Sequence, residues 1–449
     1  MTFTRITALA ALAIACGGLA HAAVTPEEAK KLGTTLTAVG AEQAGNKAGT
    51  IPAYTGGLTT PPTGFTVGSG MRPDPFAGEK PLLSIDAKNM AQYQTMLTDG
   101  TQALMKAYPG FRIDVYKTHR SVAFPKFVLA NTAKCALSAK ATNGGRSMEG
   151  CQAGFPFPIP QNGFEAMWNH LVRFNGQSYQ SKYRNINVDA NGHPTLATEG
   201  FSVQEYPFWE PSNKDSDIFW RIKLTYTEPA RRAGEALLIV DPLDMGQKDR
   251  RAWSYLPGQR RVRVAPDFAF DTPNPGTAGA TTFDDTFIFN GSMDRFEFKL
   301  LGKKEMYVPY NDYAAVYKST QAGLLGPHFL NPDLVRWELH RVWVVEATLR
   351  PGKRHVYSKR VFYLDEDSWA ALASDEYDAR GQLYRAGFAF MTPSYDLPAP
   401  YTDMFCHYDL VARIYALTGY VAETGGVRFS KALSDREWTP DSLAGSGIR

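Results

Sequence analysis

The sequence predicts a mainly β protein with some helices, built on a large, curved antiparallel sheet that forms a sandwich or a barrel. Apolar and polar residues alternate with a period of two in several segments, and turn signals rich in Gly and Pro separate these segments at regular spacing. No parallel strand–helix–strand rhythm is present. Hydrophobic residues make up 44% of the 449-residue chain, enough for a large core, and the net charge of +3 gives no indication of nucleic-acid binding.

The alternation is clearest at the start of residues 217–266. Trp220, Ile222, Leu224 and Tyr226 alternate with polar residues. Successive side chains of a strand point to opposite faces, so these four share one face of a half-buried strand. Because the exposed positions are cationic or polar, the segment predicts a curved sheet that encloses something apolar rather than a reaction centre.

The next strands of this meander are expected at 236–240, 251–256 and 260–264. Pro257 and Gly258 suit the two central positions of the turn before the last strand, since Pro presets φ and Gly tolerates positive φ. If these strands pair in sequence order, Trp253 and Tyr255 should face the same interior as Trp220.

The N-terminus is typical of a secretory signal peptide. Arg5 is followed by an apolar stretch, residues 6–15, and by an Ala20-His21-Ala22 cleavage signal. We expect cleavage after Ala22 and export of a soluble mature chain. Lipidation at Cys16 is the less favoured alternative, because the residues before it lack the leucine of a lipobox. No later apolar run is long enough to span a membrane.

Residues 23–110 are expected to form an arm, loops and one helix that packs on the sheet. Residues 40–58 are rich in Gly and small residues and predict an ordered loop or arm. Residues 84–108 carry an apolar stripe at helical spacing, and Gly100 makes a bend or break there possible. The stripe fits either ordinary packing on the sheet or a lid over a cavity.

Three cysteines remain after export. Cys135 and Cys151 flank a polar, Gly-rich loop and predict a local disulfide, which export permits. Cys406 is then expected to be a buried small hydrophobe. No metal site is expected, because the sequence has no Cys-x-x-Cys motif and no spaced Cys/His cluster.

The β-rich domain is expected to span residues 111–449. Asn162 and Glu165 have the spacing of a capping box and predict a helix that starts beside them. Asn191-Gly192 predicts a hairpin turn. Later strands are expected at 295–300, 343–349, 355–364 and 383–390, with a short helix at 365–373. Residues 404–416 predict another strand, with a helix as the alternative.

Six runs of the sequence carry a family resemblance: residues 40–58, 74–81, 116–120, 156–160 with Trp168-Asn169-His170, 253–266 and 302–311. Together they resemble a Gram-negative periplasmic family of unknown function, often labelled outer-membrane lipoprotein-sorting-like. The resemblance implies an incomplete antiparallel barrel that wraps an apolar cavity and is plugged by helices. It also implies a periplasmic location, with a resistance-nodulation-division-type exporter and an outer-membrane protein as possible partners. It carries over no catalytic residue and no cofactor.

The first functional hypothesis is therefore a periplasmic carrier for a lipid, a lipoprotein or another hydrophobic molecule. Aromatic and aliphatic residues from alternating strand positions are its candidate cavity lining, and a filled core explains their alternation about as well. The candidates are Trp220, Ile222, Leu224, Tyr226, Trp253, Tyr255, Phe296, Phe298, Trp343 and Val345.

Two other classes remain open. A periplasmic hydrolase would draw on His119, His170, His340, His355 and His407 with acids such as Glu338 and Asp409, but the sequence has no Gly-x-Ser-x-Gly elbow and no His-Glu-x-x-His motif. An interaction module of an envelope transport complex would use the basic strip Arg250, Arg251, Arg260, Arg261 and Arg263. The commoner reading of such a strip is a solvated strand face.

Overall fold

The structure is a computed structural model that describes residues 24–213, 217–265 and 270–446. The predicted signal peptide, residues 1–22, and Cys16 lie outside these ranges. Within them, no helix is both long enough and apolar enough to cross a membrane.

The fold is mainly β, as predicted. Within the described residues, sixteen strands form one large sheet that is not closed, in the order β1-β2-β12-β13-β14-β15-β18-β19-β5-β6-β7-β8-β9-β10, with β11 on β12 and β20 on β5. Two further two-stranded sheets are β3–β4 and β16–β17. The described strands of all three sheets are β1 (Leu83–Ile85), β2 (Ile113–Val115), β3 (Lys140–Thr142), β4 (Ser147–Glu149), β5 (Ser178–Val188), β6 (Pro194–Glu205), β7 (Ile218–Glu228), β8 (Ala236–Pro242), β9 (Arg251–Leu256), β10 (Arg261–Val264), β11 (Phe296–Pro309), β12 (Arg336–Leu349), β13 (Lys359–Asp365), β14 (Ala371–Tyr377), β15 (Leu383–Ala389), β16 (Thr392–Ser394), β17 (Ala399–Tyr401), β18 (Phe405–Asp409), β19 (Ile414–Tyr420) and β20 (Val427–Phe429).

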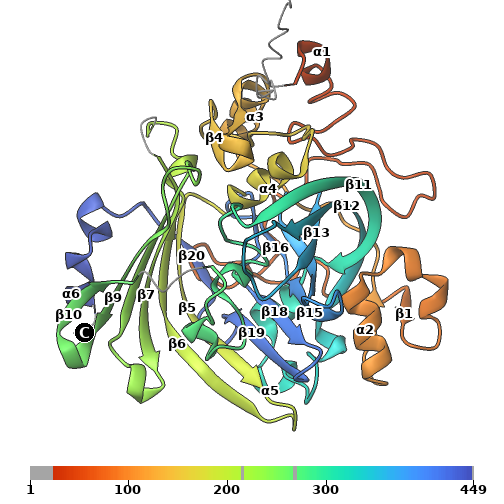
Figure 1. Ribbon diagram of the computed structural model, residues 1–449. Coiled ribbons are helices and arrows are strands. Elements are labelled where there is room, and N and C mark those ends of the chain that lie inside the picture. The colour runs from red at the N-terminus through yellow and green to blue at the C-terminus, as the bar shows by residue number, and fades with distance from the viewer. Residues whose placement is uncertain (1–23, 214–216, 266–269, 447–449) are drawn as a thin grey trace, which may run out of the picture.

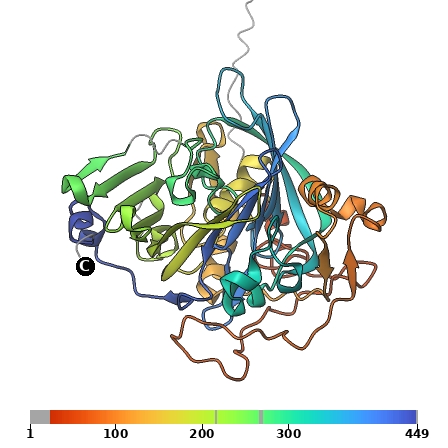
Figure 2. The same cartoon turned by 90° about the horizontal axis from the view of Figure 1, so that it is seen from below.

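The sheet curves, so that β5–β10 and β12–β15 form two facing parts (Figure 1, and from below in Figure 2). Neighbouring strands of the sheet are antiparallel, except that β2 runs parallel to the start of β12. The α-helices are α1 (Pro26–Ala29), α2 (Asp99–Ala107), α3 (Lys126–Ser138), α4 (Gly163–Leu171), α5 (Gln321–Leu324) and α6 (Asp441–Ser446).

Two helices, α4 and α6, cover different parts of the sheet. α4 begins after Asn162, whose side chain accepts a hydrogen bond from the backbone N–H of Glu165, as the capping spacing predicts. Its Phe164 ring lies 5.2 Å from the Phe298 ring of β11. α6 lies against β8, β9 and β10, where Trp438 and Leu443 complete a second, small core.

Three sequence predictions are wrong in detail. Residues 84–108 do not form one helix, because β1 takes the first residues into the sheet and α2 starts only after the Thr98 cap. Residues 365–373 are not a helix, because the Asp365 carboxylate accepts from Ser368 and closes a tight turn between β13 and β14. Residues 404–416 form two strands, β18 and the start of β19, since the Asp409 carboxylate accepts from Val411 and Ala412 and turns the chain.

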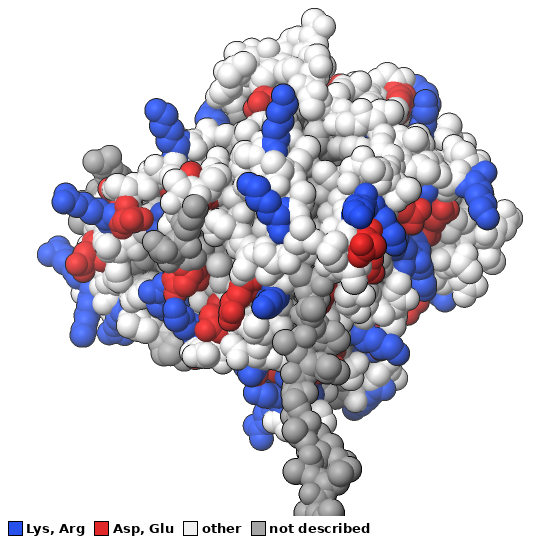
Figure 3. All heavy atoms as spheres, turned by 90° about the horizontal axis from the view of Figure 1, so that it is seen from above, with Lys and Arg blue, Asp and Glu red and all other residues white. Residues whose placement is uncertain are grey.

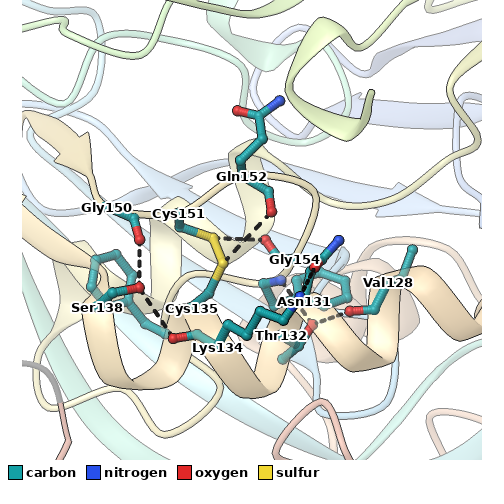
Figure 4. The surroundings of a disulfide bond; sticks show 12 residues. Val128, Asn131, Thr132, Lys134, Cys135, Ser138, Gly150, Cys151, Gln152 and Gly154 are labelled. Atoms are coloured by element: carbon teal, nitrogen blue, oxygen red, sulfur yellow. Dashed lines mark hydrogen bonds between the residues drawn. A yellow bond between two sulfur atoms is a disulfide. The ribbon is translucent and has the colours of Figure 1, made fainter. Parts of the chain in front are cut away.

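The predicted disulfide is confirmed. Cys135 on α3 bonds to Cys151, just after the β3–β4 hairpin, with 4.8 Å between the Cα atoms (Figure 4). Cys406 is a free, buried cysteine, also as predicted. The Asn191-Gly192 turn joins β5 to β6 as a hairpin.

Charged side chains of both signs are scattered over the face seen in Figure 3. Many charged groups, however, are buried in the protein interior, among them Arg360, Asp284, Asp285 and Glu376. Buried charges are costly unless they are paired, so these groups indicate a constrained interior rather than a plain apolar core.

Candidate ligand-binding site

A cavity of about 110 Å³ lies on the concave face of β5–β8. Residues 274–290 and 401–405 complete its wall, together with Thr418 and Gly419 of β19. The cavity thus lies between the curved sheet and a loop that follows β10 in sequence.

The wall formed by β7 and β8 is apolar. Ile222 pairs with Ile239, and Leu224 pairs with Leu237, so these side chains stand on the same face of two neighbouring strands. All four line the cavity, as do Trp220 and Tyr226.

The wall formed by β5 and β6 is polar. Ser181 and Ser202 lie 3.0 Å apart across the strands, and Gln204 accepts a hydrogen bond from the Trp220 indole at 3.0 Å. Gln204 in turn donates to Asp403 at 2.7 Å. The cavity is therefore amphipathic, with aliphatic and aromatic groups on one side and hydroxyl and amide groups on the other.

Asp403 provides a buried carboxylate on the cavity wall. Its Oδ2 accepts hydrogen bonds from both the Tyr179 hydroxyl and the Gln204 amide. Burial raises the pKa of Asp403, although the charge of Arg173 and these hydrogen bonds act in the opposite direction. Thr418 Oγ1 on the same wall has no hydrogen-bond partner among the described residues.

Residues 282–290, called the plug segment below, contact both parts of the sheet. The Phe287 ring lies 5.8 Å from the Trp220 ring on the cavity side, and the Phe289 ring lies 5.2 Å from the Phe362 ring of β13 on the other side. Phe287 and Ile288 have φ of 56° and 71°. A β-branched residue rarely adopts such a conformation, so the surrounding contacts must hold the segment in place.

A buried cluster of charged and polar side chains holds the plug segment in place through hydrogen bonds. The Arg360 guanidinium donates to Asp284 Oδ2 and Asp285 Oδ1 at 3.0 Å each, and to the carbonyl of Ile288 at 3.1 Å. The Tyr357 hydroxyl also donates to Asp285. Burial alone would raise the pKa of Asp285, but the positive groups around it, Arg360 among them, hold that pKa below its ordinary value.

The sequence prediction for β7 agrees with its placement, because all four candidates line the cavity: Trp220, Ile222, Leu224 and Tyr226. Their role as ligand contacts stays a prediction.

The expectation for Trp253 and Tyr255 is wrong. The strands do pair in sequence order, but the register sets Ala236 opposite Tyr255 and Leu238 opposite Trp253. Both aromatics therefore lie on the far face, in the small core under α6.

The remaining candidates belong to another part of the interior. Phe296, Phe298 and Val345 are buried in the large core below α4, and Trp343 packs against it with its ring 6.1 Å from that of Trp369. None of these four lines the β5–β8 cavity. Their alternation therefore reflects a packed core at this end of the sheet.

Of the five histidines of the hydrolase hypothesis, His170, His355 and His407 lie near the plug segment, and His119 and His340 lie elsewhere beside acidic residues. His119 lies 2.7 Å from Glu79, His340 lies 3.1 Å from Glu338, and His355 lies 3.0 Å from Asp284. His170 has both ring nitrogens engaged with backbone groups of Phe289 and Ala371, and burial lowers its pKa to about 3. Asp409, one of the candidate acids, closes the turn after β18.

The basic strip is divided by the fold. Arg250 points inward and makes two hydrogen bonds of 2.7 Å to Asp241. Arg251, Arg260, Arg261 and Arg263 are exposed on and beside β9 and β10. Because β10 ends the sheet, its charges also discourage edge-to-edge pairing with another chain.

No sequence pattern indicates the polar wall, Asp403 or the plug segment. The segment Asp284-Asp285-Thr286-Phe287-Ile288-Phe289-Asn290 places apolar residues between acids and an amide. This mixed pattern is compatible with a buried loop. It has neither the period of a strand nor that of a helix, so it does not predict which residues face the interior.

Three comparisons place the chain among known proteins. A family model described as "Protein of unknown function (DUF1329)" matches residues 84–444, which is more than half of the chain. An uncharacterized protein of Pseudomonas aeruginosa, PA3922, is 40% identical over 433 residues, with 95% of each chain covered.

Solved structures are similar over a smaller part of the chain. A putative outer membrane lipoprotein-sorting protein domain from Vibrio parahaemolyticus matches with 15% identity and a TM-score of 0.44, covering 63% of this chain and 98% of that one. A DUF1329 family protein from Desulfovibrio piger matches with 16% identity and a TM-score of 0.43, covering 62% and 95%.

Proposed function

This chain belongs to the DUF1329 family of proteins of unknown function, and from its own cavity we propose that it binds and carries a hydrophobic or amphipathic small molecule. We place this activity in the periplasm, on the strength of the signal-peptide pattern at the N-terminus. A lipid or the acyl part of a lipoprotein is the proposed cargo, and an envelope exporter with an outer-membrane protein is the proposed partner system.

The amphipathic cavity is the observation that supports this proposal. Its β7–β8 wall offers apolar area, which favours burial of hydrocarbon by about 25 cal/mol per Å². Its β5–β6 wall and Thr418 offer hydrogen-bonding groups, and Thr418 Oγ1 is free to pair with a ligand.

The size of the cavity limits what it holds. Ligand pockets for drug-sized molecules have volumes of about 300–1,000 Å³. At about 110 Å³, this cavity accommodates a small ring or the end of a chain. A larger cargo would require the plug segment to move away from the β7 wall.

Replacing Leu224 with tryptophan is expected to block uptake of a fluorescent fatty acid. Leu224 lies on the cavity wall and is only partly buried, so the indole should take up space that a ligand would occupy. If the site were instead a packed core, the same change would overpack it at a cost of typically about 1–3 kcal/mol. Fluorescence titration and thermal melting of the same samples distinguish these cases.

Thr225→Trp is the matched control. It places the same indole on the opposite face of β7, so uptake should match that of the wild type. Mass spectrometry of an organic extract of the wild-type protein should also show a bound hydrophobic molecule. A clean extract, no uptake by the wild type and a large fall in the melting temperature of Leu224→Trp would overturn the carrier proposal and leave the interaction module as the better account.

A further inference from the structure

Four neighbouring strands present polar side chains on one buried face behind the plug segment. In register, Arg360 of β13 stands beside Glu376 of β14 and Arg385 of β15. The adjacent row contains Ser374, Gly387 and His407 of β18. Asp285 reaches this face from the plug segment, through its hydrogen bond from Arg360.

Two of these side chains have unused ligand atoms. His407 is 2% exposed, and neither of its ring nitrogens has a hydrogen-bond partner among the described residues. Glu376 is fully buried, and its Oε2 likewise lacks a partner there, while Oε1 accepts from the Ser374 hydroxyl. Buried polar atoms are paired in the great majority of cases, so two such groups on one face require an explanation.

Ligand atoms of three residues converge on this face. One ligand atom each from Asp285, Glu376 and His407 lies within 4.8 Å of the others. The glycine at position 387 makes room for this arrangement, since a Cβ there would lie 2.8 Å from His407 Nε2 and 2.6 Å from Ser374 Oγ. The His407 imidazole thus occupies space that a side chain at position 387 would otherwise fill.

The cluster also contains more carboxyl groups than guanidinium groups. Four carboxylates, those of Asp284, Asp285, Glu376 and Asp409, share this interior with the two guanidinium groups of Arg360 and Arg385. Arg360 lies 3.7 Å from Glu376 and repels a cation, so the carboxylates and the imidazole must outweigh that repulsion.

We propose that Asp285, Glu376 and His407 form a binding site for one divalent first-row transition-metal ion. One imidazole and two carboxylates suit Zn²⁺, Mn²⁺ or Fe²⁺, whereas Ca²⁺ and Mg²⁺ prefer oxygen ligands alone. Ligand atoms of a zinc site lie about 2.0–2.2 Å from the metal, so a small inward movement of these side chains completes the site. The ion would tie the plug segment to β14 and β18, and so would hold one wall of the cavity in place.

The test uses the untagged, full mature protein, treated with chelator, loaded with Zn²⁺ and desalted. Mass spectrometry of the metal content is expected to find one Zn²⁺ per chain, and the melting temperature should rise by several degrees, because a ligand that binds only the folded state stabilises it. Loading with Co²⁺ should give visible absorption bands from a nitrogen- and oxygen-ligated ion. Ca²⁺ should produce neither effect.

His407→Gln and Glu376→Gln are the decisive variants. The two ring nitrogens of His407 and Oε2 of Glu376 have no hydrogen-bond partner among the described residues, so neither substitution breaks a hydrogen bond at these atoms. Both variants should therefore fold, which circular dichroism checks. Each is expected to weaken Zn²⁺ binding by tenfold or more. His340→Gln is the matched control, because His340 is also a buried histidine beside two carboxylates, Asp365 and Asp367, in a separate group. It should bind Zn²⁺ as the wild type does.

Absence of stoichiometric Zn²⁺ binding by the wild type would overturn this proposal, as would equal binding by His407→Gln. Loss of binding in His340→Gln but not in His407→Gln would assign the metal to the other group and would equally overturn it. The carrier proposal is independent of all these outcomes, since fatty-acid uptake is measured separately.

Discussion

Arg360→Leu is expected to destabilise the folded protein by about 3–5 kcal/mol, the cost of removing one partner from a buried ion pair. Arg360 is fully buried and donates hydrogen bonds to Asp284, Asp285 and the carbonyl of Ile288. Leucine fills part of the space but leaves two buried carboxylates without one of their positive partners. Urea unfolding followed by circular dichroism measures the change in the free energy of unfolding.

The loss should depend on pH. The charge of Arg360 helps to hold the pKa of Asp284 and Asp285 below the ordinary value, so in the wild type their stabilising contribution is present above pH 4 and is lost only in stronger acid. Without Arg360 these pKa values rise, and protonation then relieves the unpaired charge. The difference between variant and wild type should therefore be larger at pH 7 than at pH 5.

Arg350→Leu is the control for this experiment. Arg350 forms an ion pair with Glu297, whose side chain is 65% exposed. Exposed ion pairs contribute at most about 1 kcal/mol to the free energy of unfolding. Equal stability losses at Arg350 and Arg360, or a loss at Arg360 that does not change with pH, would contradict the account of the buried cluster given above.

Removing the disulfide by Cys135→Ala with Cys151→Ala is expected to cost about 3 kcal/mol in the loop-entropy account. The bond closes a loop with a sequence separation of 16 between α3 and the end of the β3–β4 hairpin. Without it, the unfolded chain regains the freedom that the loop restricted. Urea unfolding of the oxidised protein, the reduced protein and the double variant measures this cost.

Thiol mapping provides the complementary test. Cys406 is buried and free, so alkylation of the oxidised protein should label Cys406 alone, and only after unfolding. Reduced wild type and the double variant should show similar losses of stability. Labelling of Cys135 or Cys151 in protein taken from the periplasm would rule out the bond, and no change on reduction would rule out its contribution.

The sequence by itself determined features that depend on neighbours along the chain. The period of two in β7 placed Trp220, Ile222, Leu224 and Tyr226 on one face, and the structure keeps them together on the cavity wall. The Asn162 cap and the β5–β6 hairpin turn follow from local hydrogen bonding and backbone freedom. The disulfide likewise joins two cysteines close in sequence.

Only the tertiary structure decided which faces and which distant residues meet. Alternation shows that Trp253 and Tyr255 share a face but not which one, because a shift of one residue in strand pairing turns every side chain to the other side. The helical stripe at residues 84–108 was overridden by pairing of β1 with β2. Asp285, Glu376 and His407 come from a loop and two strands far apart in sequence, so no spacing motif could reveal them. Their convergence depends on the register of β14, β15 and β18 and on the packing of the plug segment against them, which long-range contacts determine and local sequence does not.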